Sequence, residues 1–79
     1  MQSTQHAVAQ AAEVQRVRLG KKKTAVAAEM GISLPSLSKR LSGAIPLDLN
    51  DIDSLARALD MDPFDLLAAA RSEVATAAA

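Results

Sequence analysis

Cationic and hydroxyl side chains are concentrated in one stretch of the chain, residues 21–42. Lysine and arginine carry a positive charge, and serine and threonine hydroxyls both donate and accept hydrogen bonds. Together such groups bind anionic oxygen atoms, including those of phosphates. This composition favours an anion-binding surface, and its members are Lys21, Lys22, Lys23, Thr24, Ser33, Ser36, Ser38, Lys39, Arg40 and Ser42.

Groups that would support catalysis or metal binding lack their partners in the sequence. His6 is the single histidine, and it has no Cys, Asp or Glu at a metal-ligand spacing. The serines have no histidine to activate them, and the carboxylates cluster where helix capping explains them. The sequence has no cysteine and no glycine-rich phosphate loop. We therefore expect neither an enzyme nor a bound metal, cofactor or small-molecule ligand.

The zero net charge of the chain hides two halves of opposite sign. Residues 1–43 contain seven Lys and Arg against two Glu, whereas residues 44–79 contain two Arg against seven Asp and Glu. A basic half in a neutral protein favours contact with a polyanion. The alternative is that the two halves pair with each other within the fold, and charge alone does not separate these two interpretations.

The composition predicts one small all-α domain. Of the 79 residues 49% are hydrophobic, and 17 of these are alanine. Alanine and leucine favour helices, and the chain has few aromatic residues and little alternation that would favour strands. No stretch is apolar over the length of a membrane span, and Met1 is followed by polar residues rather than by a signal peptide pattern. We expect a cytoplasmic protein.

Glycines, prolines and capping residues divide the chain into five predicted helices. The first covers residues 4–19 and ends at Gly20, and Val14 and Val17 are its expected apolar anchors. Its opening is only weakly amphipathic. We therefore expect residues 1–12 to be a frayed extension of this helix.

The next two helices are short and each ends at a glycine. One covers residues 22–30 and ends at Gly31, and the other follows the N-cap residue Ser33 and ends at Gly43. The latter has an apolar stripe that is expected to face the core, formed by Leu34, Leu37 and Leu41.

The last two helices begin at aspartates. Asp48 and Asp51 predict a capping box for the fourth helix. Asp62 and Pro63 predict an N-cap and a first helical residue for the fifth helix. The expected buried stripes are Ile52, Leu55, Ala56 and Leu59 in the fourth helix and Phe64, Leu66, Leu67 and Ala70 in the fifth. Residues 75–79 are expected to be a disordered tail, which leaves 13–74 as the domain.

The spacing within residues 22–42 is typical of a helix-turn-helix. Two helices that cross steeply need a small side chain where their axes approach, and Ala27 supplies it. The turn needs a residue that tolerates a positive φ, which Gly31 supplies. Leu37 then anchors the second helix, which covers residues 34–42.

The chain resembles the lambda repressor and Cro family of helix-turn-helix proteins, often called XRE, over residues 13 to 70. The resemblance is carried by three runs in the right order, namely Met30 to Ser33, Leu37 to Gly43, and Leu55 to Leu59 followed by Asp62 to Leu67. Lys22 and Lys23 depart from the polar pair that usually opens the motif. The resemblance implies a compact five-helix, lambda-repressor-like fold that binds double-stranded DNA.

The helix that covers residues 34–42 is the expected recognition helix. We expect its outer face to contact bases in the major groove through Pro35, Ser36, Ser38, Lys39 and Arg40. We expect phosphate contacts from Lys21, Lys22, Lys23, Thr24, Ser33 and Ser42. The alternatives are that Lys39 and Arg40 only solubilise a surface helix, that Lys21 and Lys22 cap the first helix, and that Arg18 pairs with Glu29.

The expected function is a sequence-specific transcriptional regulator, a repressor that occludes its operator. The resemblance also implies a homodimer on palindromic half-sites, association with the nucleoid, and an origin in a phage or mobile element. Two alternatives stay open. One is an antitoxin-type autorepressor, and the other is a protein-interaction module that uses the acidic C-terminal helices.

Overall fold

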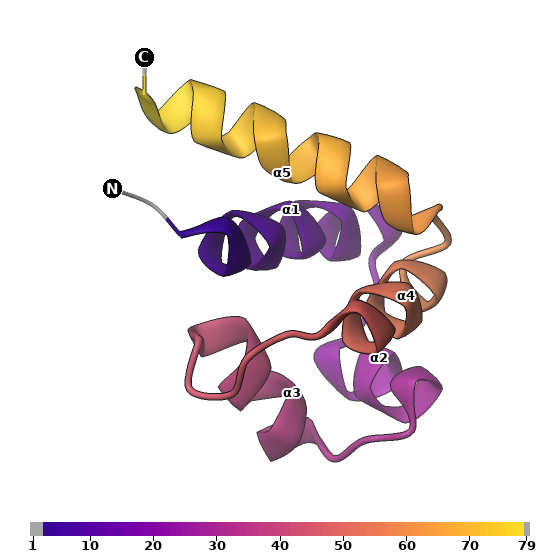
Figure 1. Ribbon diagram of the computed structural model, residues 1–79. Helices are drawn as coiled ribbons and strands as arrows, with labels where there is room; N and C mark the ends of the chain where they lie inside the picture. Colours follow the sequence, from indigo (N-terminus) through magenta and orange to yellow (C-terminus); the bar gives the residue numbers. More distant parts are fainter. Residues whose placement is uncertain (1–2, 79) are drawn as a thin grey trace.

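Five helices make up the computed structural model (Figure 1): α1 (Thr4–Leu19), α2 (Lys23–Met30), α3 (Leu34–Ser42), α4 (Leu49–Ala58) and α5 (Pro63–Ala78). The structure describes the backbone of residues 3–78 and the side chains of residues 3–74. The predicted all-α, five-helix class is confirmed. None of the described helices is both long and apolar enough to span a membrane.

Capping residues set the helix boundaries as the sequence predicts. Gly20 follows α1 with a φ of 65°, a left-handed conformation that favours glycine. The Ser33 hydroxyl accepts a hydrogen bond from the Ser36 N–H at 3.2 Å at the start of α3. Asp48 and Asp51 form the predicted capping box of α4, with distances of 2.7 and 3.2 Å. These three boundaries therefore have a local chemical cause.

Every helix contributes to a single core. The largest fully buried side chains are Val8 of α1, Val26 of α2, Leu37 of α3, Leu55 of α4, Leu59 just after it, and Leu66 of α5. No polar or charged residue is buried among the side chains that the structure describes. Because burial of one such side chain stabilises a fold by about 1.5 to 3 kcal/mol, α3 is fixed to the body largely through Leu37.

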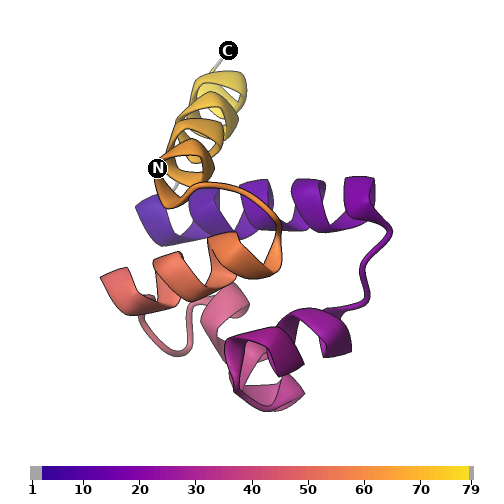
Figure 2. The ribbon, with the colours of Figure 1, turned by 90° about the vertical axis from the view of Figure 1, so that its right-hand side faces the viewer.

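The opening of α1 is packed from Ala7 onwards, and residues 1 and 2 of the predicted frayed extension lie outside the described residues. Val8 is buried, as are the small residues Ala7, Ala11 and Ala12. The exposed residues are instead Val14 (42%) and Val17 (63%), the two predicted apolar anchors. The cause is α5, which crosses α1 and makes the most extensive helix–helix contact of the fold (Figures 1 and 2). Alanines permit the close approach of the two axes, but they give only a weak apolar pattern in the sequence.

The end of the chain also differs from the prediction. The backbone of α5 is helical as far as Ala78, beyond the predicted end of the domain at residue 74, and residue 79 lies outside the described residues. Alanine is the best helix former, which accounts for the continued helix. Leu66 and Ala70 face the core as expected, whereas Phe64 is 78% exposed.

Candidate nucleic-acid interface

The helices α2 and α3 form the predicted helix-turn-helix. Ala27 is buried where the two helices pack, so the small side chain permits their crossing. Gly31 has a φ of 73°, and the following Ile32 N–H donates to the Ala27 carbonyl at 3.0 Å. These contacts turn the chain between the helices, and α3 then lies on the outside of the molecule (Figures 1 and 2).

The outer face of α3 is small and polar. Leu37 is buried and Leu41 is partly buried, and together they define the inner side of the helix. Leu34 was expected on that side but is exposed at the first turn of α3. Four predicted contact residues are exposed, namely Pro35, Ser38, Lys39 and Ser42. Their placement suits entry of this face into a groove.

Arg40 points towards α4 instead, and Ser36 is hydrogen-bonded to it. The Arg40 guanidinium donates through Nη1 to the Ser36 carbonyl at 3.2 Å and to the Ser36 hydroxyl. Its Nε lies 3.3 Å from Asp51 Oδ2 in an ion pair. Both side chains of that pair are 19% exposed. Arg40 thus joins α3 to the capping box of α4, and the structure does not place it on the outer face with Lys39.

Two of the three consecutive lysines are exposed at the start of α2. Lys22 is the N-cap residue but makes no side-chain capping hydrogen bond, and Lys23 and Thr24 form the exposed first turn. A cation at a helix N-terminus opposes the macrodipole. The start of α2 therefore presents uncapped amides and two cations to the surroundings.

Lys21 is used within the fold. Its ammonium group lies 2.7 Å from Glu29 Oε2 and donates to the Ala58 carbonyl at 2.5 Å. Ala58 is the last residue of α4, where a cation is favourable. Glu29 thus pairs with Lys21, and the alternative pairing of Arg18 with Glu29 is not observed.

An ion pair fixes the end of α1. Arg16 pairs with Glu13 and donates to the Lys21 carbonyl at 2.8 Å, which ties α1 to the turn before α2. The hydrogen bonds from Arg16 hold the pKa of the Glu13 carboxyl below its ordinary value, and Lys23 adds a smaller effect of the same sign. The hydrogen bond from Arg16 to the Lys21 carbonyl therefore helps to fix the position of the turn from which α2 begins.

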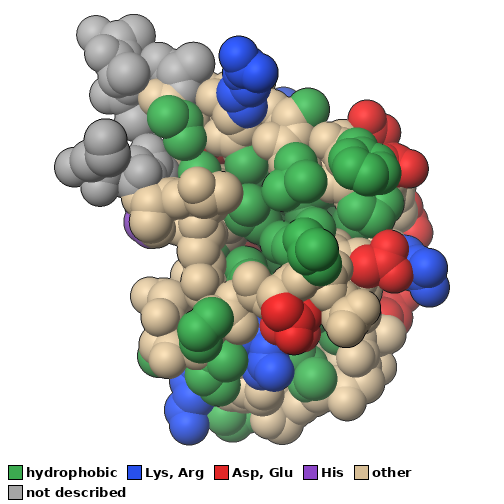
Figure 3. Space-filling view, in the orientation of Figure 1, with side chains coloured by type: hydrophobic (Ala, Val, Ile, Leu, Met, Phe, Trp, Pro, Cys, Tyr) green, Lys and Arg blue, Asp and Glu red, His purple; other side chains and the backbone are tan. Residues whose placement is uncertain are grey.

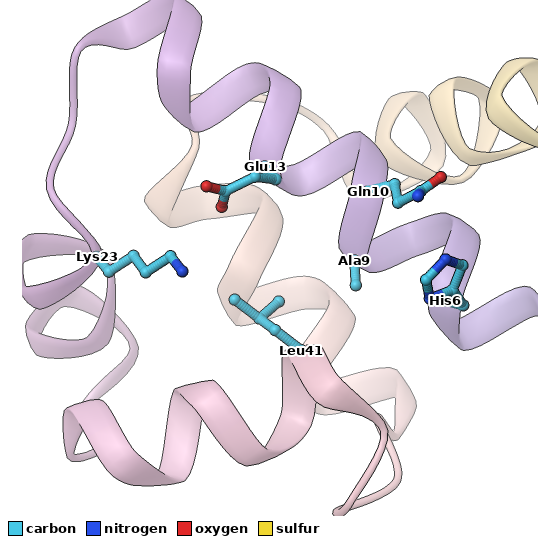
Figure 4. Close-up of a pocket in the computed structure, with 6 residues that line it drawn as sticks. All are labelled: His6, Ala9, Gln10, Glu13, Lys23 and Leu41. Atoms are coloured by element: carbon cyan, nitrogen blue, oxygen red, sulfur yellow. The ribbon is translucent and has the colours of Figure 1, made fainter.

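A hollow of about 260 Å³ lies between α1, the start of α2 and the end of α3 (Figure 4). Glu13 and Lys23 point towards it from opposite sides, and Leu41 lies below them. The other lining residues are His6, Ala9 and Gln10. No group of three His, Cys, Asp or Glu in the described part of the chain is placed to hold a metal ion.

The structure divides the basic half into two groups of cations. Arg16, Lys21 and Arg40 form ion pairs, and Arg40 pairs directly with the acidic half through Asp51. A second group remains exposed and forms no ion pair with any residue that the structure describes, namely Arg18, Lys22, Lys23 and Lys39. An ion pair between the two halves is therefore observed for Arg40, whereas the exposed cations are left unpaired on the surface.

Comparisons with known proteins agree with this arrangement. The helix-turn-helix family model HTH_3 matches residues 13–66. The solved structure of the clp gene regulator ClgR from C. glutamicum is similar, with a TM-score of 0.83 and 21% sequence identity over 91% of this chain and 94% of that one. No curated protein sequence matches. The structural likeness shows the fold, and the family match covers well over half of the chain. The chain therefore belongs to the HTH_3 family of helix-turn-helix proteins, which are DNA-binding regulators rather than enzymes.

Proposed function

We propose that the protein binds a specific double-stranded DNA operator and represses transcription by occluding it. The observation that carries this proposal is the exposed, unpaired Lys39 on the outer face of α3, beside the uncapped and cationic start of α2. One element supplies groups that read base edges, and the other supplies groups that hold phosphates. In this proposal the protein acts in the cytoplasm, on the nucleoid.

Base recognition is assigned to the outer face of α3. A single helix fits the major groove, which is about 12 Å wide in B-DNA. Lys39 suits guanine O6 or N7, Ser38 suits either a donor or an acceptor on a base edge, and Pro35 suits a thymine methyl group. Ser36 and Arg40 are left out of this set because their polar groups bind each other and Asp51.

Phosphate binding is assigned to the start of α2 and to the two ends of α3. Lys22, Lys23 and the Thr24 hydroxyl surround the free amides of α2, which attract an anion. Ser33 and Ser42 lie at the ends of α3 and are exposed. Lys21 is left out because Glu29 and the Ala58 carbonyl occupy its ammonium group.

A second copy of the chain is the proposed partner on DNA. Hydrophobic side chains gather along α5 on one face of the molecule (Figure 3). Phe64, Leu67 and Val74 are exposed on this helix, and a groove of about 310 Å³ separates α5 from the start of α1. A module of this size buries little DNA surface by itself, and linking two modules on adjacent half-sites raises affinity through effective concentration.

Selection of bound sequences from random duplex DNA tests the proposed function. The expected result is enrichment of a palindromic sequence whose half-sites lie about one helical turn apart. Recovery of sequences without any common element would contradict a sequence-specific operator. A single enriched half-site would retain specific binding but contradict the homodimer.

A further inference from the structure

The side chain of Gln5 holds the end of the recognition helix. Its amide nitrogen, Nε2, donates to the Arg40 carbonyl at 3.0 Å and to the Ile45 carbonyl at 2.7 Å. Gln5 lies in the first turns of α1, 35 and 40 residues away along the sequence. One amide group thus joins three segments of the chain: α1, the last turn of α3 and the loop that leaves it.

The hydrogen bond to the Arg40 carbonyl adds to the pairing of the C-terminal carbonyls of α3. The last carbonyls of a helix have no partner within the helix and need outside donors. The Lys39 carbonyl accepts from the Ile45 N–H at 3.1 Å and from the Ser42 hydroxyl at 3.0 Å. The Arg40 carbonyl accepts from the Gly43 N–H at 3.3 Å and from Gln5. The Ile45 carbonyl reaches Gln5 because the loop folds back beneath the helix.

We propose that Gln5 is a positioning residue for sequence recognition, which acts by fixing the direction in which α3 presents Lys39. Leu37 is the one fully buried side chain of α3, Leu41 packs against the core one turn later, and the Arg40–Asp51 ion pair holds the helix on the side of α4. Gln5 supplies the hold on the side of α1. Without it, α3 can pivot about Leu37, and Lys39 lies close enough to the released end to move with it. The inference rests on the proposed function, since it requires that α3 reads DNA.

The chain contains a matched control for this role. Gln15 is also in α1, is also partly buried, and its Nε2 also donates to a backbone carbonyl, that of Leu59 at 3.1 Å. Leu59 is the C-cap residue of α4, so Gln15 holds α4 and not the recognition helix. Gln5→Met and Gln15→Met each remove an amide donor at nearly constant side-chain volume.

The experiment measures the affinity of wild type and both variants for the selected operator and for a random duplex of equal length. The circular dichroism melting curve of each variant shows whether it is folded at the assay temperature. In Gln5→Met the ratio of operator affinity to random affinity is expected to fall about tenfold, within the range for one lost base contact. In Gln15→Met that ratio should stay at the wild-type value. A loss of folded protein alone would lower both affinities equally and leave the ratio unchanged.

Two kinds of result would contradict the positioning role of Gln5. The positioning role would be overturned if folded Gln5→Met keeps the wild-type ratio of operator affinity to random affinity, or if this ratio falls equally in both variants. Sequence-specific binding would still stand in either case. If wild type itself shows no preference for any duplex, the proposed function fails and the inference fails with it. If Gln5→Met does not fold, Gln5→Asn replaces it in the experiment. Its amide is on a side chain one methylene shorter, so it should lose the same preference for the operator over the random duplex.

Discussion

At the scale of single residues, Asp60 has an unfavourable backbone conformation. It follows the C-cap of α4 with a φ of 56°, and it is the one described residue other than glycine with a positive φ. Its carboxylate also lies at the negative end of the α4 macrodipole. Asp60→Gly should therefore raise the free energy of unfolding by about 0.5 to 1 kcal/mol, which urea denaturation measures.

A second variant tests the cost of a Cβ in the left-handed conformation where no charge changes. Gly43 has a φ of 90°, and nothing lies within 4 Å of an added Cβ. Gly43→Ala should therefore destabilise through backbone strain alone. A lower free energy of unfolding in Asp60→Gly would contradict the prediction that the left-handed conformation of Asp60 is strained.

Lys39 is the residue on which the proposed reading of bases depends most. Lys39→Ala should weaken binding to the selected operator by about 1 to 3 kcal/mol and relax the preference at one or two base pairs. Binding assays on the operator and on its single-base variants measure both effects. Arg57→Ala is the control, because Arg57 is 76% exposed on α4 and its loss changes the net charge equally. Equal weakening by Lys39→Ala on operator and random DNA would show that Lys39 contacts only phosphate.

The orientation of the Arg40 side chain could not be predicted from the sequence. Helical periodicity correctly indicates that Leu37 faces the core and Lys39 faces outwards. Arg40 lies on the flank between these sides, and its orientation is decided by Asp51, which belongs to another helix. The position of that helix depends on tertiary packing. A local pattern does not contain that information, so the inward turn of Arg40 was not predicted.

At the scale of elements, the start of α2 gives a test of phosphate contact. Replacement of both Lys22 and Lys23 by Gln should weaken binding about equally on all sequences. It should reduce the slope of log affinity against log salt by about 1 to 2 units, since each phosphate contact contributes roughly 0.9. The melting temperature should stay constant or rise slightly, because two cations leave a helix N-terminus.

Lys21→Gln is the internal control for that measurement. It removes the ion pair with Glu29 and the hydrogen bond to the Ala58 carbonyl, so stability should fall while the salt slope is maintained. The opposite result is a salt slope that is lowered by Lys21→Gln and unchanged by the replacement of Lys22 and Lys23. It would show that Lys21, and not Lys22 and Lys23, contacts phosphate.

The helix boundaries were predictable because their causes are local. Gly31, Ser33 and the Asp48–Asp51 capping box act within a few residues, and each ends or begins a helix where the sequence indicates. The packed opening of α1 was missed because its contacts are distant. Ala7 and Ala11 become core residues only when α5 crosses them, and Gln5 acquires its role only when Ile45 returns beneath α3.

At the scale of the whole molecule, the apolar surface of α5 predicts association on DNA. Two copies should bind each operator fragment, and sedimentation of the complex at saturating protein measures this stoichiometry. Leu67→Glu places a charge beside the groove between α5 and α1 and should reduce operator affinity by preventing the second copy from docking. A strict one-to-one complex of wild type with the operator would contradict the proposed dimer.

The central claim is that the start of α2 and the outer face of α3 contact DNA, and titration followed by amide NMR tests it most directly. Addition of the selected duplex to labelled protein should shift the amide signals of residues 22–24 and 34–42 most strongly. The amides around Asp53 and Arg57, on the acidic side of the molecule, should change little. If the largest amide shifts occur in α4 and the signals around Lys39 do not move, the account is contradicted. That result would favour a binding surface formed by the acidic helices.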